Sequence, residues 1–133
     1  MQPPSIHFGT GAAHDYHYPS NSLIITSKGA ISRGWFDYLK IKNFARFDAV
    51  EPNPSIETVE KIISQFKNEN FSSIIGLGGG SSLDVAKFVA FKIGKKKIMI
   101  PTTFGSGSEV TRISVLNVDG KKTSFHNEKI LAD

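Results

Sequence analysis

The sequence predicts an α/β fold with a mainly parallel sheet, flanking helices and a small β-hairpin near the C-terminus. Strand-like and helix-like patterns alternate along the chain with short links, which is typical of βαβ units. The run around Ile74 and Ile75 is continuously apolar, as expected for a strand that is covered on both faces. The runs 113–118 and 123–125 flank an Asp-Gly dipeptide, which favours a hairpin turn.

The early part of the chain contains two predicted strands and one weak helix. Residues 23–26 form a short β-branched run that predicts a strand, and this strand ends at Ser27. A helix is expected at 31–39, although Gly34 lowers its intrinsic stability. Residues 44–50 alternate apolar and polar side chains, which indicates a half-buried strand.

The clearest helix pattern follows a Pro-Asn-Pro turn at 52–54. Ser55 is a favourable N-cap, and Glu57 and Glu60 suit the positive start of a helix. Apolar side chains then recur at the spacing of one helical face. These side chains are Val59, Ile62, Ile63 and Phe66.

The next part repeats the strand–helix–strand order. Residues 73–77 predict a buried strand, and a helix is expected at about 82–91. The lysine run 95–97 is expected to be a solvated turn, because charge runs usually face water. Residues 98–100 predict another buried strand.

The composition describes one globular domain. The chain has 133 residues, of which 39% are hydrophobic and 21% are charged. A net charge of +4 is too small to argue for a nucleic-acid partner. The absence of cysteine excludes disulfides, thiolate zinc sites and cysteine nucleophiles. Neither a membrane-spanning run nor a signal-peptide pattern is found, so no membrane association and a cytoplasmic location are expected.

A glycine-rich turn at 78–80 is the most informative stretch, because it joins a predicted buried strand to a predicted helix. Glycines let a ligand approach the backbone, and the helix start offers unpaired N–H groups. Ser81 and Ser82 add hydroxyl donors, so the turn suits phosphate or pyrophosphate. Ser81 stands where G-x-G-x-x-G requires glycine, and the Walker A pattern is also not matched. The alternative is a turn that needs glycine for its shape alone.

A second polar stretch, residues 101–109, follows the next predicted strand. Ligands bind at this edge of an open α/β sheet, and hydroxyl side chains between glycines suit hydrogen bonding to ribose, phosphate or an amide. The spacing of His14 and His17 would suit a metal on a helix, but no third ligand is evident. The histidines are therefore interpreted as surface or packing residues.

Three motifs in register resemble the iron-containing alcohol dehydrogenase family, within the superfamily that also holds glycerol dehydrogenase and dehydroquinate synthase. They are Pro52–Pro54, the Gly78–Lys87 stretch and the Pro101–Thr111 stretch. The resemblance implies a Rossmann-like domain that binds NAD or NADP. It also implies hydride transfer between NAD(P)H and a small aldehyde or alcohol, aided by a divalent metal, iron or zinc.

The resemblance covers only part of the family fold. Residues 1–133 resemble the N-terminal NAD(P)-binding domain, and the C-terminal helical domain that holds the metal is absent from this chain. We therefore expect no metal ligand here and no turnover by the chain alone, with a homodimer as an allowed assembly. Two alternatives stay open: a lyase domain like that of dehydroquinate synthase, and a stand-alone nucleotide-binding module without catalysis.

The resemblance also implies a set of cofactor-binding residues. The glycine turn would hold the pyrophosphate, and the stretch after residue 101 would line the cofactor cleft. Asn53 matches a cofactor-contacting asparagine, Lys122 falls near a lysine that reaches a ribose, and Lys87 matches a helix lysine for which simple solvation is the alternative role. The full expected set is Ser27, Asn53, Gly79, Gly80, Ser81, Ser82, Thr102, Thr103, Ser106 and Lys122.

One departure from the family bears on cofactor choice. Relatives that prefer NAD often carry Asp after the first strand, where this chain has Ser27 beside Lys28. A carboxylate would repel the 2′-phosphate of NADP, whereas a hydroxyl beside a cation would not. We therefore predict that NADP is accepted at least as well as NAD.

Overall fold

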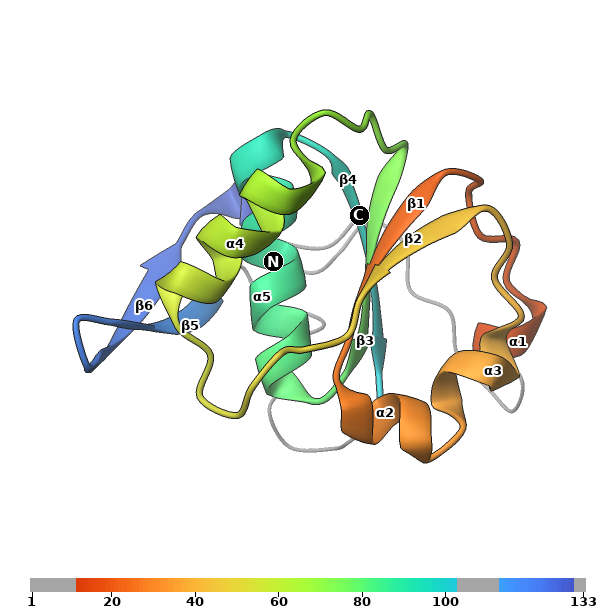
Figure 1. Cartoon of the computed structure of the whole chain (residues 1–133), viewed down its shortest axis with the longest axis horizontal. Helices are drawn as coiled ribbons and strands as arrows, with labels where there is room; N and C mark the ends of the chain where they lie inside the picture. Colours follow the sequence, from red (N-terminus) through yellow and green to blue (C-terminus); the bar gives the residue numbers. More distant parts are fainter. Residues whose placement is uncertain (1–11, 103–112, 131–133) are drawn as a thin grey trace.

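A four-stranded parallel sheet with the strand order β2-β1-β3-β4 organises the chain (Figure 1). The computed structural model describes residues 12–102 and 113–130. All four strands run in the same direction because helical crossovers join β1 to β2, β2 to β3 and β3 to β4. The strands are β1 (Ser22–Ile25), β2 (Phe44–Phe47), β3 (Ser73–Gly78) and β4 (Lys96–Pro101).

The order of the strands contains one reversal. From β1 the chain moves outward to β2, and it then returns across β1 to add β3 and β4 on the other side. The short helices α2 (Lys28–Ser32) and α3 (Trp35–Leu39) cover one face, and α4 (Ile56–Phe66) and α5 (Gly80–Ile93) cover the other (Figure 1). The links after β1 and β3 therefore leave toward opposite faces. This is the arrangement at which open α/β sheets bind ligands.

Two apolar cores lie on the two faces of the sheet. Leu23 and Ile25 of β1 pack with residues of α4 and α5, whereas Ile24 packs with Phe36 and Leu39 of α3. This alternation follows from the two-residue period of a strand. It confirms that the sheet is covered on both sides.

A hairpin of β5 (Ile113–Val118) and β6 (Lys121–His126) packs outside α5. Its turn holds Asp119 and Gly120 at φ values of 51° and 80°, the left-handed conformation that this hairpin turn requires. The ring of Phe125 lies 4.6 Å from that of Phe88, measured between centroids. The predicted hairpin is therefore confirmed, and a short 3-10 turn, η2 (Glu128–Ile130), follows it.

The Ser55 N-cap and the helix that follows it are also confirmed, since the Ser55 hydroxyl accepts a hydrogen bond from Thr58 N at 3.3 Å. The expected helix at 31–39 is instead two short helices, because Gly34 adopts a φ of 83° between them. The strand expected at 44–50 ends at Phe47.

The lysine run at 95–97 is not a solvated turn. Lys96 and Lys97 belong to β4, where they pair with β3, and Lys97 is only 6% exposed. A long lysine stem can be covered by neighbouring structure while its head finds a polar partner, so the charge pattern alone was misleading here.

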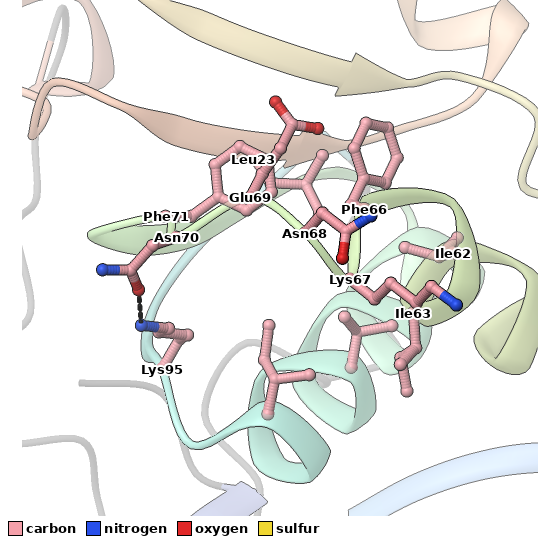
Figure 2. A pocket seen from close by; sticks show the side chains of 12 residues that line it. Leu23, Ile62, Ile63, Phe66, Lys67, Asn68, Glu69, Asn70, Phe71 and Lys95 are labelled. Carbon is pink, nitrogen blue, oxygen red and sulfur yellow. Dashed lines mark hydrogen bonds between the residues drawn. The ribbon is translucent and has the colours of Figure 1, made fainter.

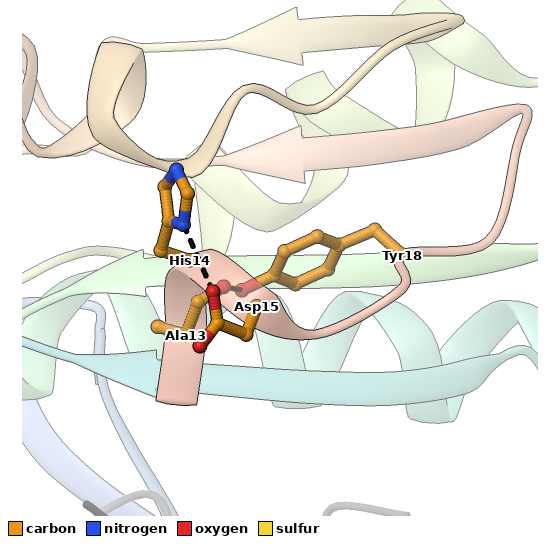
Figure 3. Close-up of polar contacts among 4 residues, drawn as sticks. All are labelled: Ala13, His14, Asp15 and Tyr18. Atoms are coloured by element: carbon orange, nitrogen blue, oxygen red, sulfur yellow. Dashed lines mark hydrogen bonds and ion pairs between the residues drawn. The ribbon is translucent and has the colours of Figure 1, made fainter. Parts of the chain in front are cut away.

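At the start of the described chain, the short helix α1 (Ala12–Asp15) is tied to the segment after it. Tyr18 donates its hydroxyl hydrogen to Ala13 O at 2.6 Å, and His14 Nδ1 lies 3.1 Å from Asp15 Oδ1 (Figure 3). Burial of the phenol, with a smaller contribution from Tyr16, raises the pKa of Tyr18 to about 12. Among the described helices, none has the length and apolarity needed to span a bilayer.

A Gly76→Ala substitution should lower the free energy of unfolding by about 1–3 kcal/mol through overpacking. A Cβ at Gly76 would lie 2.8 Å from Ala86 Cβ and 2.9 Å from Met99 Sδ. Urea unfolding followed by circular dichroism measures the change. The matched control is Gly29→Ala, which meets only the flexible end of Arg33 and should be neutral or stabilising. Equal stability of Gly76→Ala and wild type would contradict the packing account.

A Tyr18→Phe substitution should remove one contribution to the pH dependence of stability. The folded-state pKa of about 12 lies above the unfolded value of 10.0, so the contribution is complete below pH 10 and is lost as the pH rises toward 12. The difference in unfolding free energy between wild type and variant should therefore shrink across this window. Urea unfolding at closely spaced pH values tests this, and a constant difference up to pH 12 would rule it out.

Candidate functional site

A cavity of about 220 Å³ lies between the start of α5, the turn around Asn53 and the β5–β6 hairpin. It brings together four of the residues that the sequence singled out, although they are far apart along the chain. These are Asn53, Gly80, Ser81 and Lys122. Their meeting point is at the carboxyl end of β3, beside the reversal in strand order.

A larger cavity, of about 310 Å³, lies at the opposite edge of the sheet (Figure 2). Its lining includes Leu23 at the start of β1 and Phe71 just before β3, and Lys95 Nζ lies 2.6 Å from Asn70 Oδ1 at its rim. None of the expected site residues within 12–102 and 113–130 lines it. We therefore take the smaller cavity as the candidate site, because position on the sheet is more informative than volume.

The glycine turn is shaped by backbone constraints that side chains would disturb. Gly78 has a φ of +142°, and a Cβ there would lie 3.1 Å from Ser82 Oγ. Gly79 is the N-cap of α5, and its cap has no side-chain hydrogen bond, whereas α2 and α4 are capped by Ser27 and Ser55. The first N–H groups of α5 point out of the helix with a partial positive charge. This end of α5 can accept an anion.

Thr102 lies beside this turn, since its N–H donates to Gly78 O at 2.9 Å. Its Oγ1 is buried and has no hydrogen-bond partner within residues 12–102 and 113–130. A buried hydroxyl without a partner is costly and is typical of a position that a ligand completes. Two other expected residues, Thr103 and Ser106, fall outside the described ranges.

Four expected residues that the structure describes do not line the cavity: Gly79 and Thr102, which lie at the glycine turn, and Ser27 and Ser82. Ser82 is 3% exposed, and its side chain lies against Gly78. Ser27 caps α2 by accepting a hydrogen bond from Ala30 N at 3.2 Å. Because Ile25 pairs with Gly76, Ser27 follows β1 at the same sheet edge where Gly78 ends β3. Ser27 is therefore on the ligand edge but outside this cavity.

The hairpin is joined to the turn around Asn53, which adopts a φ of 51°. Asn117 donates its side-chain N–H to Asn53 O at 2.9 Å and its backbone N–H to Pro54 O at 2.8 Å. In the hairpin register Asn117 pairs with Lys122. The same strand pair therefore holds the Asn53 turn and carries Lys122 to the cavity.

Sequence reasoning missed Asp84, which lines the cavity from α5. Its Oδ2 accepts a hydrogen bond from Val115 N at 3.3 Å, and its Oδ1 lies 3.6 Å from Lys87 Nζ. Lys87 is completely buried, so the alternative of simple solvation does not hold. The signal that could have found the pair is an Asp and a Lys three residues apart on a helix whose other positions are mostly apolar.

The chemistry of the site is that of binding. Helix N–H groups, hydroxyls and the Lys122 ammonium suit an anionic ligand with polar groups along its length. Among the residues that the structure describes, no three His, Asp or Glu side chains are grouped to hold a metal ion.

Comparison with known proteins agrees with the motifs. The family profile for iron-containing alcohol dehydrogenase matches residues 3–133. Long-chain-alcohol dehydrogenase 1 of Geobacillus thermodenitrificans is 33% identical, and the alignment covers 98% of this chain and 42% of the relative. The chain thus spans about two fifths of that protein's length.

Solved structures share the fold. An iron-containing alcohol dehydrogenase from Thermotoga maritima is 31% identical, with a TM-score of 0.75 over 81% of this chain and 37% of that one. Sulfoacetaldehyde reductase from Bifidobacterium kashiwanohense, solved with NAD+, is 24% identical and has a TM-score of 0.87 over 99% of this chain and 43% of that one. The strand order and the glycine turn are consistent with the family that the profile identifies. The chain belongs to the iron-containing alcohol dehydrogenase family.

Proposed function

We propose that the chain is the NAD(P)-binding part of a metal-dependent alcohol dehydrogenase or aldehyde reductase. The complete protein would transfer a hydride between NAD(P)H and a small alcohol or aldehyde. One observation carries the proposal: Asn53, Gly80, Ser81 and Lys122 surround one cavity at the start of α5. In open α/β sheets, a diphosphate binds at the N-terminus of a helix that follows a strand, and the start of α5 is such a position.

The residues present fit a dinucleotide. The N–H groups at Gly79, Gly80 and Ser81, at the start of α5, would bind the diphosphate. Lys122 would contribute positive charge from the far wall of the cavity. The Thr102 hydroxyl, buried without a partner among the described residues, would gain one from the ligand.

Two parts of a longer protein would share the reaction, one binding the dinucleotide and the other the metal. When bound, the dinucleotide supplies the hydride. The residues of this chain that line the cavity would hold and orient it. The divalent metal, iron or zinc, would be bound by a C-terminal helical domain of the kind that the family resemblance implies. A cytoplasmic location and homodimer formation stay predictions.

The named relatives favour this reading over a lyase. The Geobacillus relative is a dehydrogenase and the Bifidobacterium neighbour is a reductase. Both names describe transfer of reducing equivalents, and the Bifidobacterium structure was solved with NAD+. An alcohol or aldehyde is the substrate class that these names have in common, and we extend that class to this protein.

We further propose that NADP is bound at least as well as NAD. Ser27, at the sheet edge after β1, has no charge of its own, and Lys28 Nζ lies 3.2 Å from Asp48 Oδ1. Arg46 Nη2 lies 3.6 Å from Asp48 Oδ2, so two cations surround one carboxylate. This edge therefore carries a local excess of positive charge that favours a 2′-phosphate.

Calorimetric titration of the chain with NADPH tests the binding proposal. Lys122→Ala should weaken binding by roughly tenfold, because one charge-assisted contact to the ligand is lost. Lys121→Ala is the matched control, since it removes the same charge from the neighbouring position of β6, which does not line the cavity. Absence of binding by the wild-type chain, with circular dichroism showing a folded protein, would reject the proposal.

Two substitutions at Ser27 test the cofactor preference. Asp and Asn both replace Ser as N-caps, so α2 should keep its stability in either variant. Ser27→Asp should weaken NADPH binding by about tenfold relative to NADH through charge repulsion, and Ser27→Asn should not. The measurement is the ratio of the two dissociation constants. An unchanged ratio in Ser27→Asp would place the 2′-phosphate elsewhere.

A further inference from the structure

We propose that Asp84 is a positioning residue, which holds the β5–β6 hairpin against α5 so that Lys122 faces the start of that helix. The inference rests on the proposed function, because it concerns the same cavity. Asp84 and Lys122 lie on opposite elements that line the cavity. The position of the hairpin along the axis of α5 decides whether Lys122 faces the start of that helix.

Asp84 joins α5 to β5 through two different groups. Its backbone oxygen accepts a hydrogen bond from Ser114 Oγ at 3.0 Å, and its carboxylate Oδ2 accepts one from Val115 N at 3.3 Å. Ser114 is fully buried, so this junction is protected from water. Successive residues of one strand are thus held by one residue of one helix.

The other carboxylate oxygen of Asp84 faces a buried cation. Lys87 Nζ lies 3.6 Å from Asp84 Oδ1, and the Lys87 side chain is 0% exposed against 17% for Asp84. A buried ammonium is costly unless charged and polar groups surround it, so the pair holds the carboxylate in one orientation. Lys87 also balances the negative charge of Asp84, which would otherwise oppose an anion in the cavity.

The position of β5 is transmitted to Lys122 through the hairpin register. Val115, held by Asp84, is two residues before Asn117, and Asn117 pairs with Lys122 across the hairpin. Leu116, between them, is 1% exposed and packs in the core. Apolar packing is not directional, whereas a hydrogen bond to Val115 N selects one height along the strand. Asn117 is also held by its hydrogen bonds to Asn53 O and Pro54 O, so Asp84 and the Asn53 turn together set where Lys122 stands.

A double-mutant cycle on NADPH affinity separates positioning from general stability. In the wild type, Lys122→Ala should weaken binding roughly tenfold. In an Asp84→Ala background it should weaken binding only about threefold, because the hairpin has lost one of its attachments and Lys122 is partly displaced. Asp37→Ala is the matched control, since it removes an exposed carboxylate from α3. Its background should leave the full Lys122 effect in place. An equal Lys122 effect in the Asp84→Ala background would overturn the proposal.

Hydrogen exchange provides a readout that needs no ligand. The Val115 amide should exchange about tenfold faster in Asp84→Ala than in wild type, while the amides of β3 keep their protection. Uniform loss of protection, or none at Val115, would contradict a local positioning role. The two proposals can also fail separately. If the wild type does not bind NADPH, but the Val115 amide alone loses protection in Asp84→Ala, the proposed function is wrong and the role of Asp84 in holding the hairpin stands.

Asp84→Asn covers the case in which Asp84→Ala does not fold. The amide keeps an acceptor for Val115 N but loses the charge that faces Lys87. It should show an intermediate exchange rate at Val115 and an intermediate coupling to Lys122. Wild-type values for both measurements in a folded Asp84→Asn protein would show that the charged pair has no positioning role.

Discussion

The close approach of α5 to β3 is the constraint on which the rest of the structure depends. Gly76 has no side chain at the crossing, and Ala86 and Met99 fill the space that a Cβ would need. The helix can therefore begin directly after Gly78, at the carboxyl edge of the sheet. A helix start placed there, without a side-chain cap, directs its free N–H groups to the position where a parallel sheet receives a ligand.

The hairpin turns this helix end into a cavity. It contacts α5 through Asp84 and the Asn53 turn through Asn117, and it contributes Lys122 to the far wall. The start of α5 and Lys122 thus place positive groups on two sides of the cavity. Buried Lys87 balances the negative charge of Asp84. A site with this charge distribution suits a diphosphate better than a neutral ligand, which connects the local geometry to the dinucleotide chemistry of the family.

Much of the fold could be predicted because it depends on local patterns. The spacing of apolar residues after Ser55 and the Asp-Gly turn each specify a backbone conformation within a few residues. The burial of two lysines was not predicted, and the reason is the same for both. Lys87 and Lys97 are long polar side chains whose burial depends on which distant elements cover them, and no local pattern reports that. The break between α2 and α3 is of a different kind, because it follows from the low helix propensity of Gly34 and its left-handed φ.

The sequence by itself determined most of the strands and helices, the glycine turn and, through three motifs in register, the family. These are properties of short segments, whose backbone preferences do not require knowledge of the rest of the chain. Only the tertiary structure decided that Asn53, Ser81, Asp84 and Lys122 share one cavity while Ser27 and Ser82 lie outside it. That outcome depends on how the hairpin packs across α5, and packing is set by contacts between residues far apart in the chain.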